Sequence, residues 1–264
     1  MKLLIFFMFT FQLAKSEVYF VTFIKGNVKL QGAKLNLKVG DKLADNDKLV
    51  FADQQSKISC ISPVKGRFDI LGSNAKTKVQ MEWVAVLKDV LLPSSAKAQL
   101  STRSILQEGQ DPAKIFKSPY ADNKILMIEG EKIIVDAKYE LDKKHFFFLQ
   151  YETSGKVMLK MVPFTNGAIL LDSRIFVDEA GNLLKLEDIS TVSFCYQDAG
   201  KSRELTKFIP SFISPEDFSQ QYQLLQQNLS AKNREAMATE IYNHFVTNYG
   251  YINNTIFTNI ISKY

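Results

Sequence analysis

The residue types that most often carry out nucleophilic chemistry are scarce in this chain. Its two cysteines, Cys60 and Cys195, each lie within a strand-like apolar run, Ile58–Ile61 and Phe194–Tyr196. Cysteine is among the most buried residue types, so two separate core thiols are one interpretation. In an oxidising compartment, a disulfide between Cys60 and Cys195 is the other. Neither position has the surroundings of a nucleophile.

The two histidines, His145 and His244, are far apart in the sequence, and each adjoins a phenylalanine. A protein metal site needs about three or four ligands. No cluster of His, Cys and Asp in the sequence supplies them. We therefore predict no metal site and no cofactor.

Paired carboxylates could hydrolyse a glycosidic bond, and two such pairs occur, Asp45 with Asp47 and Asp136 with Asp142. Each pair lies in a polar stretch between apolar runs, where aspartate typically forms turns. The motifs G-x-S-x-G, Walker A and H-E-x-x-H do not occur. We therefore predict no catalytic residue, while a hydrolase that uses one of these carboxylates or Cys195 stays open as the alternative.

The elements that must position Asp45, Asp47 and Cys60 come from the stretch between Val18 and Leu71. Apolar residues alternate there with a period near two, which predicts half-buried strands. Because the strands are short, a small barrel or a tight sandwich would best remove their exposed edges. We expect a strongly bent β-domain at 17–92. Its structural turn residues are Gly40, in a left-handed conformation, and Asp41, which caps free amides.

The order of these turns resembles the FecR-like domain of bacterial envelope proteins. The residues that carry the resemblance are Gly26-Asn27-Val28, a hairpin at Gly32, Leu37-x-x-Gly40-Asp41-x-Leu43, Asp47-x-Leu49-Val50, Ser56-x-Ile58 and Gly66. They span residues 18–71 and are mainly turn positions. The resemblance therefore implies a fold and a bacterial envelope setting rather than a chemistry.

The N-terminus has the pattern of a signal peptide. Met1-Lys2 precedes an apolar run at 3–14, which is too short for the about 20 residues of a spanning helix. Small residues at Ala14 and Ser16 predict cleavage before Glu17. An uncleaved anchor or a buried first strand is the alternative. Cleavage removes Lys2 and Lys15 and lowers the formal net charge from +5 to +3, which is too mild to predict a nucleic-acid partner.

The rest of the chain predicts a linker, a second β-domain and helices. Residues 93–119 are polar and contain prolines, with a short helix expected near Pro112. Seven short apolar runs at 120–209 predict a second sandwich-like domain, with a hairpin at Asn166-Gly167. A helix start at Ser214-Pro215 opens a helical tail at 210–264. No further segment predicts a membrane span.

Taken together, these features predict a mainly β protein (α+β overall) that is exported to the periplasm or the cell surface. Without a catalytic centre, it is expected to be a non-catalytic envelope protein that binds or scaffolds a protein or glycan partner. The loops of the first domain are the candidate binding loops, with Lys25, Asn27, Asp45, Lys65 and Arg67 at their tips. The alternative is a secreted or periplasmic hydrolase.

Overall fold

A computed structural model describes residues 17–45, 47–74, 81–82, 109–230 and 234–264. The chain divides into two compact units, Met1–Leu92 and Pro93–Tyr264. Strands outweigh helices, so the predicted mainly β class is confirmed. The predicted signal peptide at 1–16 and most of the predicted linker, 93–108, lie outside the described residues. In the described part of the chain, no helix is long and apolar enough to cross a membrane.

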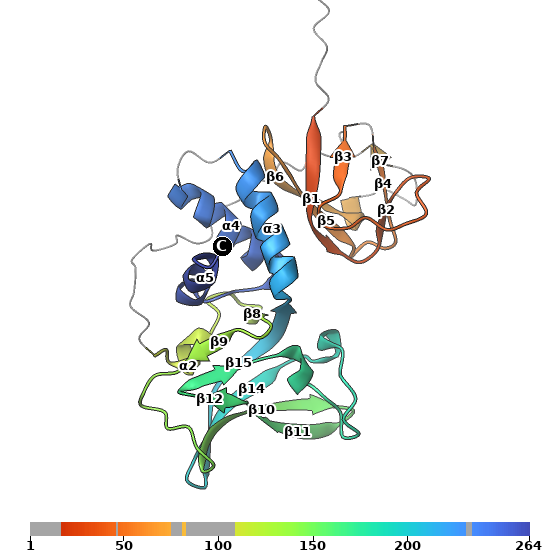
Figure 1. Cartoon of the computed structure of the whole chain (residues 1–264). Helices are drawn as coiled ribbons and strands as arrows, with labels where there is room; N and C mark the ends of the chain where they lie inside the picture. Colours follow the sequence, from red (N-terminus) through yellow and green to blue (C-terminus); the bar gives the residue numbers. More distant parts are fainter. Residues whose placement is uncertain (1–16, 46, 75–80, 83–108, 231–233) are drawn as a thin grey trace, which may run out of the picture. The chain divides into compact units, whose positions relative to one another are not determined.

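The first unit consists of two small sheets (Figure 1). One has the order β3-β1-β5-β6, from β1 (Val18–Lys25), β3 (Lys42–Ala44), β5 (Lys57–Ser62) and β6 (Gly66–Leu71). The other has the order β2-β4-β7, from β2 (Val28–Leu30), β4 (Lys48–Phe51) and β7 (Met81–Glu82). A 3-10 turn, η1 (Gly72–Asn74), follows β6.

The two sheets share one apolar core, which includes Tyr19, Val28, Leu49, Cys60 and Phe68. The core residues alternate along their strands, as the period of two predicts. Strand β1 bends at an irregularity between Val21 and Phe23, where its pairing with β5 shifts register. Among the described residues the two sheets do not join into a closed barrel, so the sandwich is the form found.

The second unit has a five-stranded and a three-stranded sheet. The larger has the order β11-β10-β14-β15-β8, from β8 (Lys124–Ile128), β10 (His145–Thr153), β11 (Lys156–Met161), β14 (Val192–Asp198) and β15 (Lys201–Ile213). The smaller has the order β12-β13-β9, from β9 (Lys132–Ile134), β12 (Phe164–Thr165) and β13 (Ala168–Leu170). Two 3-10 turns, η2 (Ser173–Ile175) and η3 (Leu186–Asp188), lie between β13 and β14.

Local turn chemistry behaves as the sequence predicts in this unit. Asn166 and Gly167 have φ of 48° and 73° and connect β12 to β13, which confirms the predicted tight hairpin.

Strand β15 runs to Ile213, beyond the predicted domain end at 209. Its last residues pair with β8 in parallel and no longer with β14, so Pro210 occupies a position without a ladder bond to β14.

The described end of the predicted linker, 109–119, packs into the second unit. The predicted short helix is α2 (Pro112–Ile115), capped by the Asp111 carboxylate. Phe116, which follows it, is fully buried, with its ring centroid 4.8 Å from that of Phe194 and 5.2 Å from that of Phe208. This part of the segment is therefore a core element rather than a surface connection.

Three helices complete the second unit: α3 (Pro215–Asn228), α4 (Arg234–Tyr249) and α5 (Asn254–Ile261). The Ser214 hydroxyl accepts the Asp217 amide and caps α3, which confirms the predicted helix start. Stacked rings of Phe218 and Phe245, with centroids 4.4 Å apart, join α3 to α4. In Figure 1 the helices lie at the β8 end of the larger sheet, and β11 lies at the other end.

Candidate functional site

In the first unit, five polar residues meet at the hydroxyl of Tyr19 and form what we call the Tyr19 cluster: Glu17, Tyr19, Asp45, Ser62 and Lys65. The Tyr19 hydroxyl lies 3.0 Å from Glu17 Oε2 and 2.9 Å from Asp45 Oδ1, and it accepts a hydrogen bond from Lys65 Nζ at 2.5 Å. Lys65 Nζ also lies 2.9 Å from Glu17 Oε2, and the Ser62 hydroxyl donates to Glu17 Oε1.

Strand pairing explains why these residues meet. Tyr19 lies near the start of β1, Asp45 directly follows β3, and Ser62 ends β5. Because β1 lies between β3 and β5 in an antiparallel sheet, all three positions fall at the same end of it. Lys65 comes from the turn between β5 and β6, and its ammonium lies 5.1 Å from the centre of the Tyr19 ring.

The electrostatics of the Tyr19 cluster favour charged carboxylates around a neutral phenol. Burial raises the pKa of the Glu17 carboxyl, but hydrogen bonds from Ser62, Lys65 and Tyr19 outweigh it, so this pKa lies below its ordinary value. Burial, together with the neighbouring Asp45 and Glu17 carboxylates, raises the pKa of the Tyr19 hydroxyl far above its ordinary range. Tyr19 therefore stays protonated and donates a hydrogen bond.

The structure brings together only part of the predicted binding loops. Asp45 and Lys65 converge in the Tyr19 cluster. Lys25 ends β1 at its other end, next to Asn27, whose side-chain oxygen accepts a hydrogen bond from Asn36 at 2.9 Å. Arg67 lies on β6 across from Ile61. The predicted loops thus lie at two ends of the unit and do not form one surface.

The Gly40-Asp41 turn has the geometry that the sequence predicts. Gly40 has a φ of +94°, and the Asp41 carboxylate accepts the Lys38 amide at 2.7 Å. The backbone of the same turn is bound to β1, because the Gly40 amide donates to the Val21 carbonyl at 2.8 Å and the Val21 amide donates to the Asp41 carbonyl at 2.9 Å. The turn therefore holds the edge of the first sheet.

Both cysteines are free thiols in the structure, each buried in its own unit. Cys60 is fully buried, and burial raises the pKa of its thiol above the ordinary range; burial also raises that of Cys195. A thiol of raised pKa is a poor nucleophile. The geometry favours two core thiols, and the disulfide between Cys60 and Cys195 stays a prediction.

The four aspartates considered for hydrolysis all contact backbone or Tyr19 groups. Asp47 accepts the Ala44 amide at 2.8 Å, and Asp136 accepts the Lys138 amide at 3.0 Å. Asp142 accepts the amides of Lys144 and His145, at 2.7 and 2.8 Å. Asp45 binds Tyr19 in the Tyr19 cluster. Asp47, Asp136 and Asp142 are thus turn-forming residues, as the sequence predicts, whereas Asp45 belongs to a hydrogen-bonded network.

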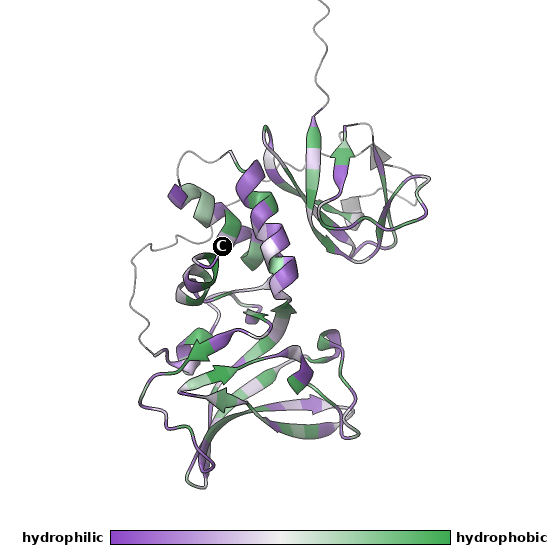
Figure 2. Ribbon diagram, in the orientation of Figure 1, coloured by the Kyte–Doolittle hydropathy of each residue, from purple (hydrophilic) through white to green (hydrophobic). Residues whose placement is uncertain are grey.

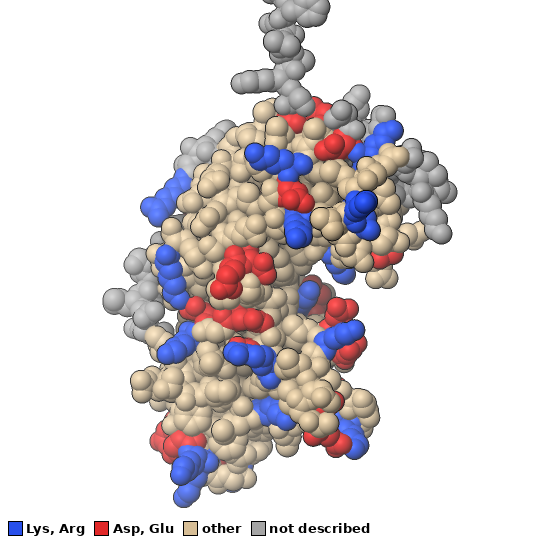
Figure 3. Space-filling model, turned by 45° about the vertical axis from the view of Figure 1, so that its right-hand side comes forward, with Lys and Arg blue, Asp and Glu red and all other residues tan. Residues whose placement is uncertain are grey.

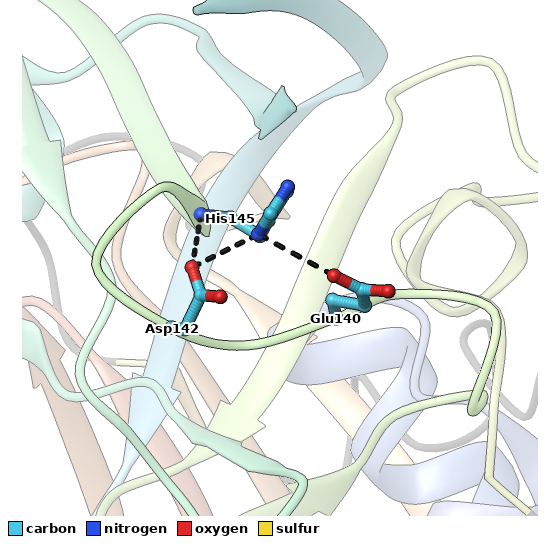
Figure 4. Close-up of side chains that lie close together, drawn as sticks. All are labelled: Glu140, Asp142 and His145. Atoms are coloured by element: carbon cyan, nitrogen blue, oxygen red, sulfur yellow. Dashed lines mark hydrogen bonds and ion pairs between the residues drawn. The ribbon is translucent and has the colours of Figure 1, made fainter. Parts of the chain in front are cut away.

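A group of charged residues in the second unit surrounds His145, at the start of β10 (Figure 4). Its Nδ1 lies 2.9 Å from Asp142 Oδ1 and 3.5 Å from a Glu140 carboxylate oxygen, while Nε2 lies 3.7 Å from Asp198 Oδ1. The hydrogen bond to Asp142 and the three negative charges raise the pKa of His145. The acids are exposed, so the group acts as a polar turn in which three carboxylates surround the imidazole.

His244, the other histidine, belongs to a buried polar network between α3 and α4. Its Nε2 lies 3.0 Å from Gln221 Oε1, and its Nδ1 lies 3.2 Å from Asn248 Nδ2. Each ring nitrogen thus has a polar partner from the helices, Gln221 on α3 and Asn248 on α4. It is a helix-packing residue.

Three aliphatic side chains of β11 are exposed on one face of the larger sheet: Val157, Leu159 and Met161 are 61%, 62% and 57% exposed. Strand β11 is the terminal strand of its sheet, and β10 is the strand paired with it among the described residues. Met161 lies across from the partly buried Phe148. In Figure 2, the ribbon of β11 carries green, apolar segments. We call Phe148, Val157, Leu159 and Met161 the β11 face.

Positive and negative side chains are mixed on the face of the molecule that Figure 3 shows, where lysines and arginines are interspersed with aspartates and glutamates. Near the β11 face, Lys156 Nζ lies 2.5 Å from a Glu179 carboxylate oxygen. Lys160 lies on the same side of β11 as Lys156, opposite to the exposed aliphatic residues.

Sequence reasoning missed three members of the Tyr19 cluster and the whole β11 face. Glu17 directly precedes β1 and lies two residues from Tyr19, a spacing that places both side chains on one side of an extended chain, and that spacing was the available signal. The run of β11, KVMLKM, is nearly continuous in apolar residues and reads as a buried strand. Comparisons with protein-family models, with curated proteins and with solved structures found no match to this chain.

Proposed function

We propose that this chain is an exported, non-catalytic envelope protein of the periplasm or cell surface, and that it binds an extended segment of a partner protein along β11. The first unit, with its FecR-like turn pattern, is the scaffold domain in this proposal. The observation that carries the binding function is the exposure of Val157, Leu159 and Met161 on a terminal strand.

A terminal strand presents unpaired N–H and C=O groups along one side, and it can accept a further strand. Natural proteins usually protect such edges. In this sheet the opposite end is protected, because the Tyr251 carbonyl accepts the Leu126 amide of β8 at 2.7 Å and the Tyr251 amide donates to the Lys124 carbonyl at 2.8 Å. The β11 end has aliphatic side chains instead, which supports a binding role for it.

The chemistry of β11 defines the partner. A strand added beside it has alternate side chains on the two faces of the sheet. One face meets Val157, Leu159 and Met161, so it should carry aliphatic or aromatic residues. The other meets Lys156 and Lys160, so it should carry acidic residues. The expected segment therefore alternates apolar and acidic positions.

A second copy of this chain is a poorer fit. In an antiparallel self-pair centred on Met158, Lys156 of one copy lies across from Lys160 of the other, and like charges directly opposite are destabilising. Centring the pair on Leu159 places Lys160 across from Met158, which gives the lysine no acidic neighbour. A partner protein that supplies a carboxylate across from Lys160, and a second one beside the Lys156–Glu179 ion pair, avoids this repulsion. A glycan has no strand of amides with which to pair the edge.

The test uses a short peptide in which valine and glutamate strictly alternate. The comparison peptide has the same composition, but all its valines come first and all its glutamates follow. Fluorescence anisotropy should show that the chain binds the alternating peptide more tightly. Leu159→Asp should weaken this binding by about 10-fold or more, equivalent to about 1.4 kcal/mol. Leu35→Asp is the matched control, because Leu35 is an aliphatic residue of the first unit that is 77% exposed; it should leave binding unchanged.

Two results would contradict the proposal. Equal binding of both peptides would mean that the chain does not distinguish the alternating order of valine and glutamate from the blocked order. Self-association of the unliganded chain in sedimentation, abolished by Leu159→Asp, would replace the partner protein with a second copy. In cells, a photoreactive residue at position 159 should crosslink to a segment of the expected pattern, whereas one at position 35 should not.

A further inference from the structure

The backbone nitrogen of Glu17 is part of the Tyr19 cluster. It lies 3.4 Å from Asp45 Oδ2, while Asp45 Oδ1 lies 2.9 Å from the Tyr19 hydroxyl. The carboxylate of Glu17 itself is bound by Tyr19, Lys65 and Ser62. The side chain and the backbone nitrogen of this one residue are therefore both fixed in the same network.

The charges of the Tyr19 cluster are unequal. Its side chains comprise two carboxylates, from Glu17 and Asp45, and one ammonium, from Lys65, around the neutral Tyr19 and Ser62. Lys65 pairs with Glu17 at 2.9 Å, which leaves Asp45 with hydrogen-bond donors but no cation among the contacts of the cluster. A partly buried carboxylate is stabilised by an adjacent opposite charge. The Glu17 nitrogen, 3.4 Å from Asp45 Oδ2, acquires a positive charge if the peptide bond before it is cleaved.

We infer that the peptide bond between Ser16 and Glu17 is a processing site, and that the amino group released there forms an ion pair with Asp45 that completes the Tyr19 cluster. This inference rests on the proposed export of the chain. The reaction is a hydrolysis by a membrane-bound signal peptidase. Water adds its hydroxyl to the Ser16 carbonyl carbon, the C–N bond breaks, and the Glu17 nitrogen takes up protons to become an ammonium.

The ammonium carries three protons in place of the single amide proton, and it brings the formal charges of the Tyr19 cluster into balance. Its ordinary pKa is about 7.7–8.0, and an ion pair with Asp45 raises this value in the folded chain. The stabilisation is therefore fully present below about pH 7.7 and is lost as the pH rises through the raised pKa. The other titratable groups of the Tyr19 cluster are the Glu17 carboxylate, Tyr19 and Lys65.

The experiment compares two full-length mature chains, one beginning at Glu17 and one beginning at Ser16. In the second chain the nitrogen of Glu17 is again an amide and the ammonium lies one residue away. Since both chains contain Lys65 and Tyr19, the titration of these groups cancels in the difference. The chain from Glu17 should have the higher melting temperature at pH 6.5, and the difference should disappear at pH 9.5. NMR should place the pKa of its amino group above about 8.

Asp45→Asn should abolish the difference between the two chains and return the amino pKa to its ordinary range. Asp47 lies in the same loop, and its carboxylate accepts the Ala44 amide. Asp47→Asn should leave the melting-temperature difference and the amino pKa unchanged. Equal melting temperatures of the two chains, or a difference that survives Asp45→Asn, would overturn the inference. Protein from envelope extracts whose sequence begins before Glu17 would instead overturn the proposed export, so the two failures are distinguishable.

Discussion

Replacement of Gly40 tests whether the Gly40-Asp41 turn holds the first sheet together. Gly40 has a φ of +94°, and left-handed conformations cost an L-residue about 1–2 kcal/mol. In a domain of 60–100 residues, about 1 kcal/mol corresponds to about 4–8 °C in melting temperature. Gly40→Ala should therefore lower the melting temperature of the first unit by about 4–16 °C.

Asp41 contributes to the same turn through its side chain. Its carboxylate accepts the Lys38 amide at 2.7 Å, and the loss of a comparable cap at a helix end costs about 0.5–2 kcal/mol. Asp41→Ala should destabilise by an amount in that range, and Asp41→Asn should cost less, because its amide oxygen can accept the same hydrogen bond. Gly40→Asn is the matched control for Gly40→Ala, since asparagine tolerates positive φ better than alanine.

Calorimetry measures the melting temperatures, and hydrogen exchange gives the local readout. The Val21 amide donates to the Asp41 carbonyl at 2.9 Å, so its exchange should accelerate in Gly40→Ala and Asp41→Ala. Exchange in β10 and β14 of the second unit should stay as in the parent chain. A Gly40→Ala variant with unchanged stability and unchanged protection of Val21 would refute the argument that the turn conformation is required.

Two further predictions concern the second unit. The pKa of His145 is raised mainly by its hydrogen bond to Asp142, so His145 contributes stability that is fully present below its ordinary pKa of about 6.5 and is lost as the pH rises through the raised value; an NMR titration of the imidazole should show the upward shift, and Asp142→Asn should reduce it. Phe116→Ala should cost about 3–5 kcal/mol in denaturant unfolding because Phe116 is fully buried, whereas Lys117→Ala, at an exposed neighbour, should change stability by less than about 0.5 kcal/mol.

Features that depend on a few neighbouring residues could be predicted from the sequence. The hairpin at Asn166-Gly167 requires two residues that tolerate positive φ. The start of α3 requires a hydroxyl that can accept the Asp217 amide. The Gly40-Asp41 turn is of the same kind. In each case the residue types alone specify the backbone conformation, so no knowledge of the tertiary structure is needed.

The Tyr19 cluster could not be predicted, because its members are separated in the sequence. Glu17 and Asp45 are 28 residues apart, and Tyr19 and Lys65 are 46 apart. Their meeting depends on the order β3-β1-β5 and on the register that pairs Tyr19 with Leu43. Many sheet orders are compatible with the same alternating pattern, and the pattern does not state which strands are neighbours.

The β11 face shows why exposure is harder to predict than strand formation. The run KVMLKM indicates a strand correctly, yet its apolar residues belong to both faces. Met158 packs against the core, while Val157, Leu159 and Met161 lie on the opposite face of the sheet, where they are exposed. On the same face, Gln150 and Glu152 of the interior strand β10 are exposed as well. Topology therefore decides which apolar residues are available to a partner.

The two ends of the larger sheet show that the exposed apolar residues of β11 are not a general feature of this unit. At β8, backbone pairing with Tyr251 covers the strand, and α4 packs against it. At β11, Lys156 and Lys160 disfavour pairing between copies, yet the aliphatic side chains between them are retained. Lysines alone would suffice to protect an unused edge. Two lysines that disfavour self-pairing, combined with three exposed aliphatic residues, suit a binding edge better than an unused one. Such an edge disfavours a second copy of the chain and favours a strand with complementary carboxylates.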